Sequence, residues 1–199
     1  MIELLDPRKI NPMYSALWRA SGWSYMLDYN WTISQALEHG GVRILDVGCG
    51  GSKVGPYISQ RLGGLYTGID RKRGQDFATY EPVHAPDIIM WVSSLEHNSP
   101  EVMRDLYLRS MDMLADGGLF LATVTVAPET GWFGPSENTN LSLTDILSLF
   151  DEPELCGEYD DVHAAYRQDD SIGKRYQARY GHWNDDDPAF IIAGVRKVK

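Results

Sequence analysis

The hydrophobic and polar positions divide most of the chain into alternating strands and helices. Short, continuous apolar runs are typical of buried strands, and four occur, at 42–47, 65–70, 87–95 and 119–126. Apolar residues at helical spacing occupy three segments, 23–39, 52–62 and 99–114. This alternation predicts an α/β fold, a three-layer sandwich with helices on both faces of a mostly parallel sheet.

The segment 71–86 interrupts this alternation. Its 16 residues could hold one short strand near 76–80, but hardly a crossover helix as well. The sequence therefore predicts a sheet that is shortened around its third strand.

The two ends of the chain lack the regular alternation of strands and helices. Residues 1–22 show little periodicity in their hydrophobic positions, so we expect an N-terminal arm with a short helix at 13–20. The segment 131–188 predicts a variable loop or lid region around a helix at 141–150. A final strand is expected within 188–198. We interpret the whole chain, 1–199, as one domain.

Charge and composition narrow the functional classes. The net charge of −10 repels phosphate backbones, so nucleic acid is not expected as a partner. The two cysteines, Cys49 and Cys156, form neither a disulfide framework nor a paired metal-binding motif. The N-terminus does not read as a signal peptide, and no apolar run has the length of a membrane span. We therefore expect a cytoplasmic protein with no membrane partner.

The stretch ILDVGCGG at 44–51 ends a predicted strand on an acid and continues with glycines. A glycine loop before a helix start lets a ligand lie against the backbone and its free N–H groups. A P-loop is excluded because Ser52-Lys53-Val54 places the lysine in the wrong order. A dinucleotide fold is disfavoured because Lys53 stands where the third spaced glycine is needed.

This stretch closely resembles the acid-x-Gly-x-Gly loop of class I S-adenosylmethionine-dependent methyltransferases. Three later stretches resemble further motifs of that family in order, namely GID at 68–70, DIIMWVSSLEH at 87–97 and LADGGLFLATV at 114–124. The likeness covers about residues 25–126. It implies a seven-stranded sheet whose last strand is antiparallel, with 155–162 and 190–197 as the final pair.

The resemblance also implies S-adenosylmethionine as the cofactor. Asp70 would accept hydrogen bonds from both ribose hydroxyls, and Asp46 would orient the methionine end. Asp76 is expected at the adenine with Phe77 beside the ring, although a solvated loop acid is an equally good interpretation of Asp76. The full predicted cofactor set is Asp46, Gly48, Cys49, Gly50, Asp70, Arg71, Asp76, Phe77 and Ser93.

The acceptor side carries fewer signals. His97 is a candidate base because its pKa normally lies near working pH, although it could equally support the end of a strand. Glu96 is a second candidate that could instead hold a polar network. No metal is expected, because the acidic run 185–187 reads as a solvated loop. Six aromatic residues suggest a lid or acceptor pocket: Trp132, Phe133, Tyr166, Tyr176, Tyr180 and Trp183.

These features predict a methyltransferase that transfers a methyl group to the oxygen or nitrogen of a small-molecule acceptor. One alternative is a domain that binds S-adenosylmethionine or S-adenosylhomocysteine without catalysis. An NAD(P)-dependent oxidoreductase is a less favoured alternative. The oligomeric state is not indicated.

Overall fold

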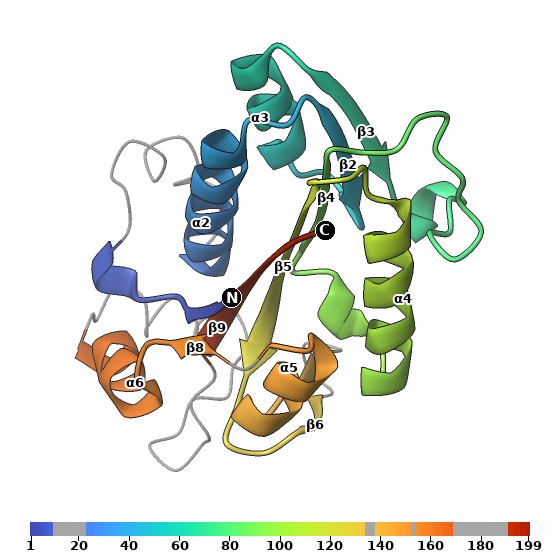
Figure 1. Ribbon diagram of the computed structural model, residues 1–199. Coiled ribbons are helices and arrows are strands. Elements are labelled where there is room, and N and C mark those ends of the chain that lie inside the picture. The colour runs from blue at the N-terminus through green and yellow to red at the C-terminus, as the bar shows by residue number, and fades with distance from the viewer. Residues whose placement is uncertain (10–22, 134–137, 153, 169–190) are drawn as a thin grey trace.

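The computed structural model describes residues 1–9, 23–133, 138–152, 154–168 and 191–199 (Figure 1). Its main sheet has seven strands in the order β3-β2-β4-β5-β9-β1-β8. The strands are β1 (Ile2–Leu4), β2 (Arg43–Val47), β3 (Leu65–Ile69), β4 (Ile88–Val92), β5 (Leu119–Val126), β8 (Leu155–Cys156) and β9 (Ile191–Val198). β9 is antiparallel to both neighbours, and the other strands run in one direction. The predicted mostly parallel, seven-stranded sheet is confirmed.

Helices cover both faces of this sheet. Figure 1 shows α2 (Trp23–His39) and α3 (Val54–Leu62) on one side, and α4 (Pro100–Met113) and α5 (Leu143–Leu149) on the other. The remaining elements are α6 (Tyr159–Gln168), the hairpin β6 (Gly131–Phe133) and β7 (Asn138–Asn140), and the 3-10 turns η1 (Pro7–Lys9), η2 (Arg71–Arg73) and η3 (Leu95–His97). None of the described helices has the length and apolar character needed to cross a membrane.

Local sequence signals set the helix ends. Ser99 caps α4, with Pro100 in its first turn, and Ser142 caps α5 by accepting the Asp145 N–H at 3.1 Å. Gly40, at φ +80°, follows the last residue of α2. All eight residues of β5 are buried, because helices cover both faces of this central strand.

The short strand predicted at 76–80 is wrong. These residues form turns, and β3 is left at the edge of the sheet. Two carbonyls of the segment, those of Phe77 and Tyr80, accept hydrogen bonds from Arg109 of α4 at 3.0 and 2.7 Å. The Arg109 side chain thus satisfies backbone groups that a neighbouring strand would otherwise pair.

The N-terminal arm is also corrected, because its first residues enter the sheet. β1 lies between β9 and β8, with Ile2 and Leu4 fully buried. Three residues are too few to carry a readable alternation, and their strand geometry comes from pairing with β9. The helix predicted at 13–20 lies outside the described residues.

The strand expected over 155–162 is largely wrong. Only Leu155–Cys156 form a strand, and α6 follows, beginning at Tyr159. Two acids, Asp160 and Asp161, stand in its first turn, where negative charge favours a helix start.

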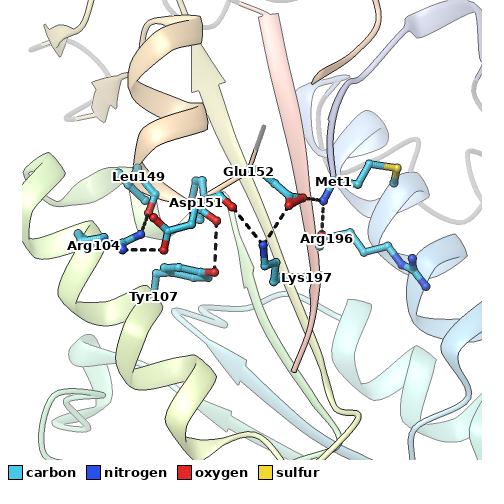
Figure 2. A network of polar contacts seen from close by, with 9 residues as sticks. Met1, Arg104, Tyr107, Leu149, Asp151, Glu152, Arg196 and Lys197 are labelled. Atoms are coloured by element: carbon cyan, nitrogen blue, oxygen red, sulfur yellow. Dashed lines mark hydrogen bonds and ion pairs between the residues drawn. The ribbon is translucent and has the colours of Figure 1, made fainter. Parts of the chain in front are cut away.

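A polar network fastens α4 and β9 to the turn after α5 (Figure 2). Arg104 donates to the Leu149 carbonyl and pairs with Asp151 at 2.7 Å. Lys197 of β9 pairs with Glu152 at 3.0 Å, and the Met1 amino group pairs with the same carboxylate. This network joins the helical layer to the β9–β1 side of the sheet, away from the edge considered next.

Candidate functional site

A cavity of about 410 Å³ lies at the carboxyl ends of the central strands. From β2 the chain first builds β3 on one side and then returns to build β4 on the other. The connections after β2 and β4 therefore diverge, and open α/β sheets bind ligands at such a switch point. The predicted site residues that line this cavity are Gly48, Gly50, Asp70, Arg71, Asp76, Phe77, Ser93 and His97.

The glycine loop after β2 forms one wall of the cavity. Gly48 has φ +71°, and a Cβ there would lie 2.5 Å from the Cβ of Ser94. The N–H groups of Gly48 and Cys49 donate to the Ile69 carbonyl at the end of β3. The loop thus needs glycine both for its backbone conformation and for its close approach to the β4 connection.

Asp70 holds this loop from the end of β3. Its Oδ2 accepts the Gly50 N–H at 2.8 Å, and its Oδ1 accepts the Lys72 N–H at 2.7 Å. A carboxylate offers about four acceptor positions, so about two remain for a ligand. The residue therefore both anchors the loop and presents a paired acceptor to the cavity.

An aromatic pair forms the far end of the cavity. The Phe77 and Trp91 rings meet edge to face with centroids 4.9 Å apart. Asp76 Oδ1 accepts the Ala78 N–H at 3.0 Å and lies 3.8 Å from Arg71. Arg71 also donates to Asn98 at 3.4 Å, so it connects the η2 side of the cavity to the segment after η3.

Asp46 and Cys49 lie beneath the loop and do not line the cavity. Asp46 is 2% exposed and accepts the Tyr66 hydroxyl at 3.2 Å. Burial raises the pKa of Asp46 to about 7, and the Tyr66 hydrogen bond opposes that shift. Burial likewise raises the pKa of the Cys49 thiol. In this arrangement the Asp46 carboxyl supports the loop from below.

The close contact between helix and strand occurs at Gly55, two residues beyond Lys53. A Cβ at Gly55 would lie 2.1 Å from the Tyr66 ring of β3. Gly55 therefore allows the close helix–strand contact that the dinucleotide spacing assigns to position 53.

The end of β4 is fixed by side chains from two other elements. Ser93 has φ +46°, which is unusual for a residue with a side chain. Its N–H donates to Thr123 Oγ1 of β5 at 2.9 Å, and its hydroxyl donates to Asp28 Oδ2 of α2 at 2.5 Å. Asp28 is fully buried, and burial raises its pKa to about 8, with the nearby charge of Glu96 adding to the shift.

The two candidate catalytic residues face different surroundings. His97 is exposed and lines the cavity. Glu96 is buried, and its carboxylate accepts the N–H and hydroxyl of Thr125 at 2.6 and 2.9 Å, and the Asn138 amide at 3.3 Å. Burial raises the pKa of Glu96. Glu96 therefore holds β5 and β7 together and does not line the cavity.

Sequence reasoning missed several residues at this site. Trp91, Ser94 and Asn98 line the cavity, and Asp28 lies directly behind Ser93. One sequence feature could have identified Asp28. It is an acid on the same helix face as Trp31 and Thr32, which are buried, so its position predicts a buried carboxyl.

The expected lid and metal residues are only partly described. Trp132 is 60% exposed on β6. Tyr166 is buried and bonds the Leu5 carbonyl and the Ile192 N–H, so it belongs to the core rather than to an acceptor pocket. Tyr176, Tyr180, Trp183 and the acidic run 185–187 lie outside the described residues, as does the Phe133 side chain. Within the described ranges, no group of three or more His, Cys, Asp or Glu side chains is placed to hold a metal ion.

Comparisons with known proteins bear on the fold. No protein-family model and no curated protein sequence matches the chain. The [4+2]-cyclase SpnF is similar in structure, with a TM-score of 0.58 and 18% identity, covering 90% of this chain and 84% of that one. The 1,6-didemethyltoxoflavin N1-methyltransferase of Burkholderia thailandensis has a TM-score of 0.54 and 14% identity, covering 92% and 81%.

The sugar N-methyltransferase KedS8 of Streptoalloteichus is a third example, with a TM-score of 0.50 and 13% identity, covering 71% of this chain and 85% of that one. These likenesses agree with the strand order, the single antiparallel strand and the cavity at the switch point. The chain has the fold of the class I S-adenosylmethionine-dependent methyltransferases, without a strand at 76–80 and with β1 as an additional strand of the sheet.

Proposed function

We propose that this protein is a methyltransferase that uses S-adenosylmethionine to methylate a small-molecule acceptor. One observation carries the proposal. Asp70 presents about two unused acceptor positions to a cavity at the switch point, directly beside a glycine loop. A vicinal diol is the ligand group that matches such a paired acceptor, and the ribose of this cofactor supplies one.

The described residues suit the rest of the cofactor as well. The cavity volume falls within the range of about 300–1,000 Å³ that is usual for small-molecule sites. Phe77 and Trp91 offer apolar ring surface for the adenine, and the backbone at Gly48 is open to the methionine side. When bound, the cofactor supplies an electrophilic methyl group on a positively charged sulfur. The protein's part is to align the acceptor with that methyl group and exclude water.

The acceptor is proposed to be a small molecule methylated on oxygen or nitrogen. The structurally similar N1-methyltransferase and sugar N-methyltransferase act on small molecules, and the net charge of −10 disfavours nucleic acid. His97 is the proposed base because it is exposed and lines the cavity, whereas Glu96 is committed to three hydrogen bonds. We further propose a cytoplasmic location.

A second candidate function is cofactor binding without methyl transfer. Its support is that the similar structures include a [4+2]-cyclase, since one fold hosts unrelated reactions. An NAD(P)-dependent oxidoreductase is less favoured because the similar structures described above include two methyltransferases and no dinucleotide-dependent enzyme.

Titration calorimetry of the purified chain with S-adenosylmethionine, S-adenosylhomocysteine, NADH and NADPH separates these functions. We expect binding of the first two and none of the last two. Absence of both adenosyl ligands from a chain shown to be folded by circular dichroism would exclude the proposal. A screen of amines, phenols, carboxylates and sugars with methyl-labelled cofactor then tests for transfer. Binding without transfer to any class would favour the second candidate.

A further inference from the structure

A carboxyl group lies immediately behind the cavity wall, at the end of β4. Asp28 is 0% exposed, and its Oδ2 lies 2.5 Å from the hydroxyl oxygen of Ser93, which lines the cavity. Its second oxygen, Oδ1, has no hydrogen-bond partner among the described residues. One hydroxyl group thus separates a buried, incompletely satisfied carboxyl from the cavity.

The geometry at Ser93 determines which part of its hydroxyl group faces the cavity. When Asp28 is ionised, its carboxylate only accepts hydrogen bonds, so the single hydroxyl proton of Ser93 is then directed to Asp28. The lone pairs of the Ser93 oxygen therefore remain for the cavity. The bond from the Ser93 N–H to Thr123 holds the residue at φ +46° and keeps this orientation.

The electrostatic surroundings of Asp28 are negative. Glu96 of η3 is the charged group that acts on it and raises its pKa, whereas hydrogen bonds from the neutral Ser93 and Thr123 side chains lower it. No ion pair within the described ranges includes Asp28 or Glu96. His97 lowers the pKa of Glu96 and so favours its charged form, against the effect of burial. Burial and the nearby Glu96 raise the pKa of Asp28 to about 8, and a positive charge brought nearby favours its ionisation, because water screens a buried charge poorly.

The two forms of the proposed cofactor differ in this respect. S-adenosylmethionine carries a positively charged sulfonium, and the demethylated product has a neutral thioether. We propose that Asp28 is a positioning residue which, through Ser93, makes the cavity prefer the cationic methyl donor over its neutral product. This inference rests on the proposed function, and it implies that loss of the methyl group weakens binding and aids product release.

Calorimetry with three ligands tests the inference without an acceptor. The probes are S-adenosylmethionine, S-adenosylhomocysteine and sinefungin, in which an amine-bearing carbon replaces the sulfonium. We expect Asp28→Asn to weaken the two cationic ligands about tenfold and the neutral product by less than about twofold. Ser93→Ala should reduce the same preference, because it removes the hydroxyl oxygen that faces the cavity and through which Asp28 acts.

Thr32→Val provides a matched control on the same helix face. Thr32 is also buried, and its hydroxyl likewise has no partner among the described residues, but it carries no charge. This variant should leave the ratio of the donor and product affinities unchanged. If it shifts the ratio as Asp28→Asn does, the effect belongs to helix packing and the inference is wrong.

The pH dependence supplies a second readout. Burial raises the pKa of Asp28 to about 8 in the free protein, so a bound cation should favour release of its proton. The donor-to-product affinity ratio should therefore rise between about pH 6 and 9 in the wild type, and rise less in Asp28→Asn. Equal weakening of all three ligands by Asp28→Asn, or an unchanged ratio, overturns the role of Asp28 alone. A folded wild type that binds none of the three ligands overturns the proposed function as well.

Discussion

The cavity has two halves that are built in different ways. The glycine-loop half, residues 48–51 with Asp70, comes from two adjacent strands and is held largely by backbone N–H groups. The α2 half, comprising Asp28, Ser93 and Thr123, comes from three elements and is held by side chains. The first half presents glycine backbone and a paired acceptor, and the second presents the Ser93 hydroxyl with a buried carboxyl behind it.

This difference suggests a division of work between the halves. Backbone groups and a partly exposed carboxylate recognise the shape and the hydroxyl groups of a ligand. They should therefore bind the cationic methyl donor and its neutral product equally well. A buried carboxyl responds to charge, because burial makes its ionisation sensitive to what lies nearby. If the comparison is right, substitutions in the two halves should have different signatures with the same ligands.

Replacing Asp70 by Ala should give the largest effect. The change removes the paired acceptor and releases the Gly50 N–H, so both adenosyl ligands should bind about 100-fold more weakly. Calorimetry measures this loss, which should be equal for donor and product. The exposed acid Asp105 of α4 supplies the control, since Asp105→Ala should leave both affinities unchanged. An affinity that survives Asp70→Ala would remove the ribose assignment.

Gly48→Ala should damage the glycine-loop half through its backbone. The new Cβ would meet Ser94 at 2.5 Å and would sit at a positive φ, so the unfolding free energy should fall by about 2 kcal/mol. Urea denaturation checks this value. Gly51→Ala is the matched control, because a Cβ at Gly51 meets nothing within 4 Å. Equal stability of the two variants would show that the loop tolerates a side chain where the geometry forbids one.

The α2 half should be visible in the pH dependence of stability. Burial raises the pKa of Asp28 to about 8 and of Asp46 to about 7, above the ordinary value of 3.8. Between about pH 4 and 8 the native state keeps protons that the unfolded state has lost, so stability falls as pH rises.

Asp28→Asn removes one of these groups and should flatten that fall. Relative to wild type, the variant should gain about 2.5 kcal/mol in unfolding free energy between pH 6 and 8.5. Urea denaturation at several pH values measures the two curves. Parallel curves would mean that the Asp28 carboxyl does not keep its proton in the native state.

Arg109→Met should give the smallest effect, at the aromatic end of the cavity. Arg109 bonds the Phe77 and Tyr80 carbonyls, so its loss should loosen this segment and weaken S-adenosylhomocysteine about fivefold. Hydrogen exchange at 77–81 should rise in parallel. Arg104→Met, on the same helix, removes bonds at the far end of α4 and should leave the affinity unchanged. If both variants weaken the ligand equally, the effect belongs to the helix rather than to the segment.

Much of the fold could be predicted because its signals are local. The buried strands, the capped helix α4 and the acid-glycine loop each occupy a few consecutive residues. β1 could not be predicted, because three residues carry no readable period and their conformation is imposed by β9. The turns at 76–80 depend on Arg109, which is about 30 residues away in the chain, so the local sequence still favoured a strand.

The candidate site divides in the same way. The sequence by itself determined the glycine loop and Asp70. The loop glycines directly follow the end of β2, and Asp70 directly follows the end of β3, the next strand in the chain. It also brought Ser93 and His97 into the predicted set, since both lie in the stretch 87–97 that resembles the fourth-strand motif of the family. Only the tertiary structure decided that Asp46 and Glu96 lie away from the cavity, and that Asp28 stands behind Ser93. Burial and charge depend on every element packed around a group, and that packing is not written in any one stretch of the chain.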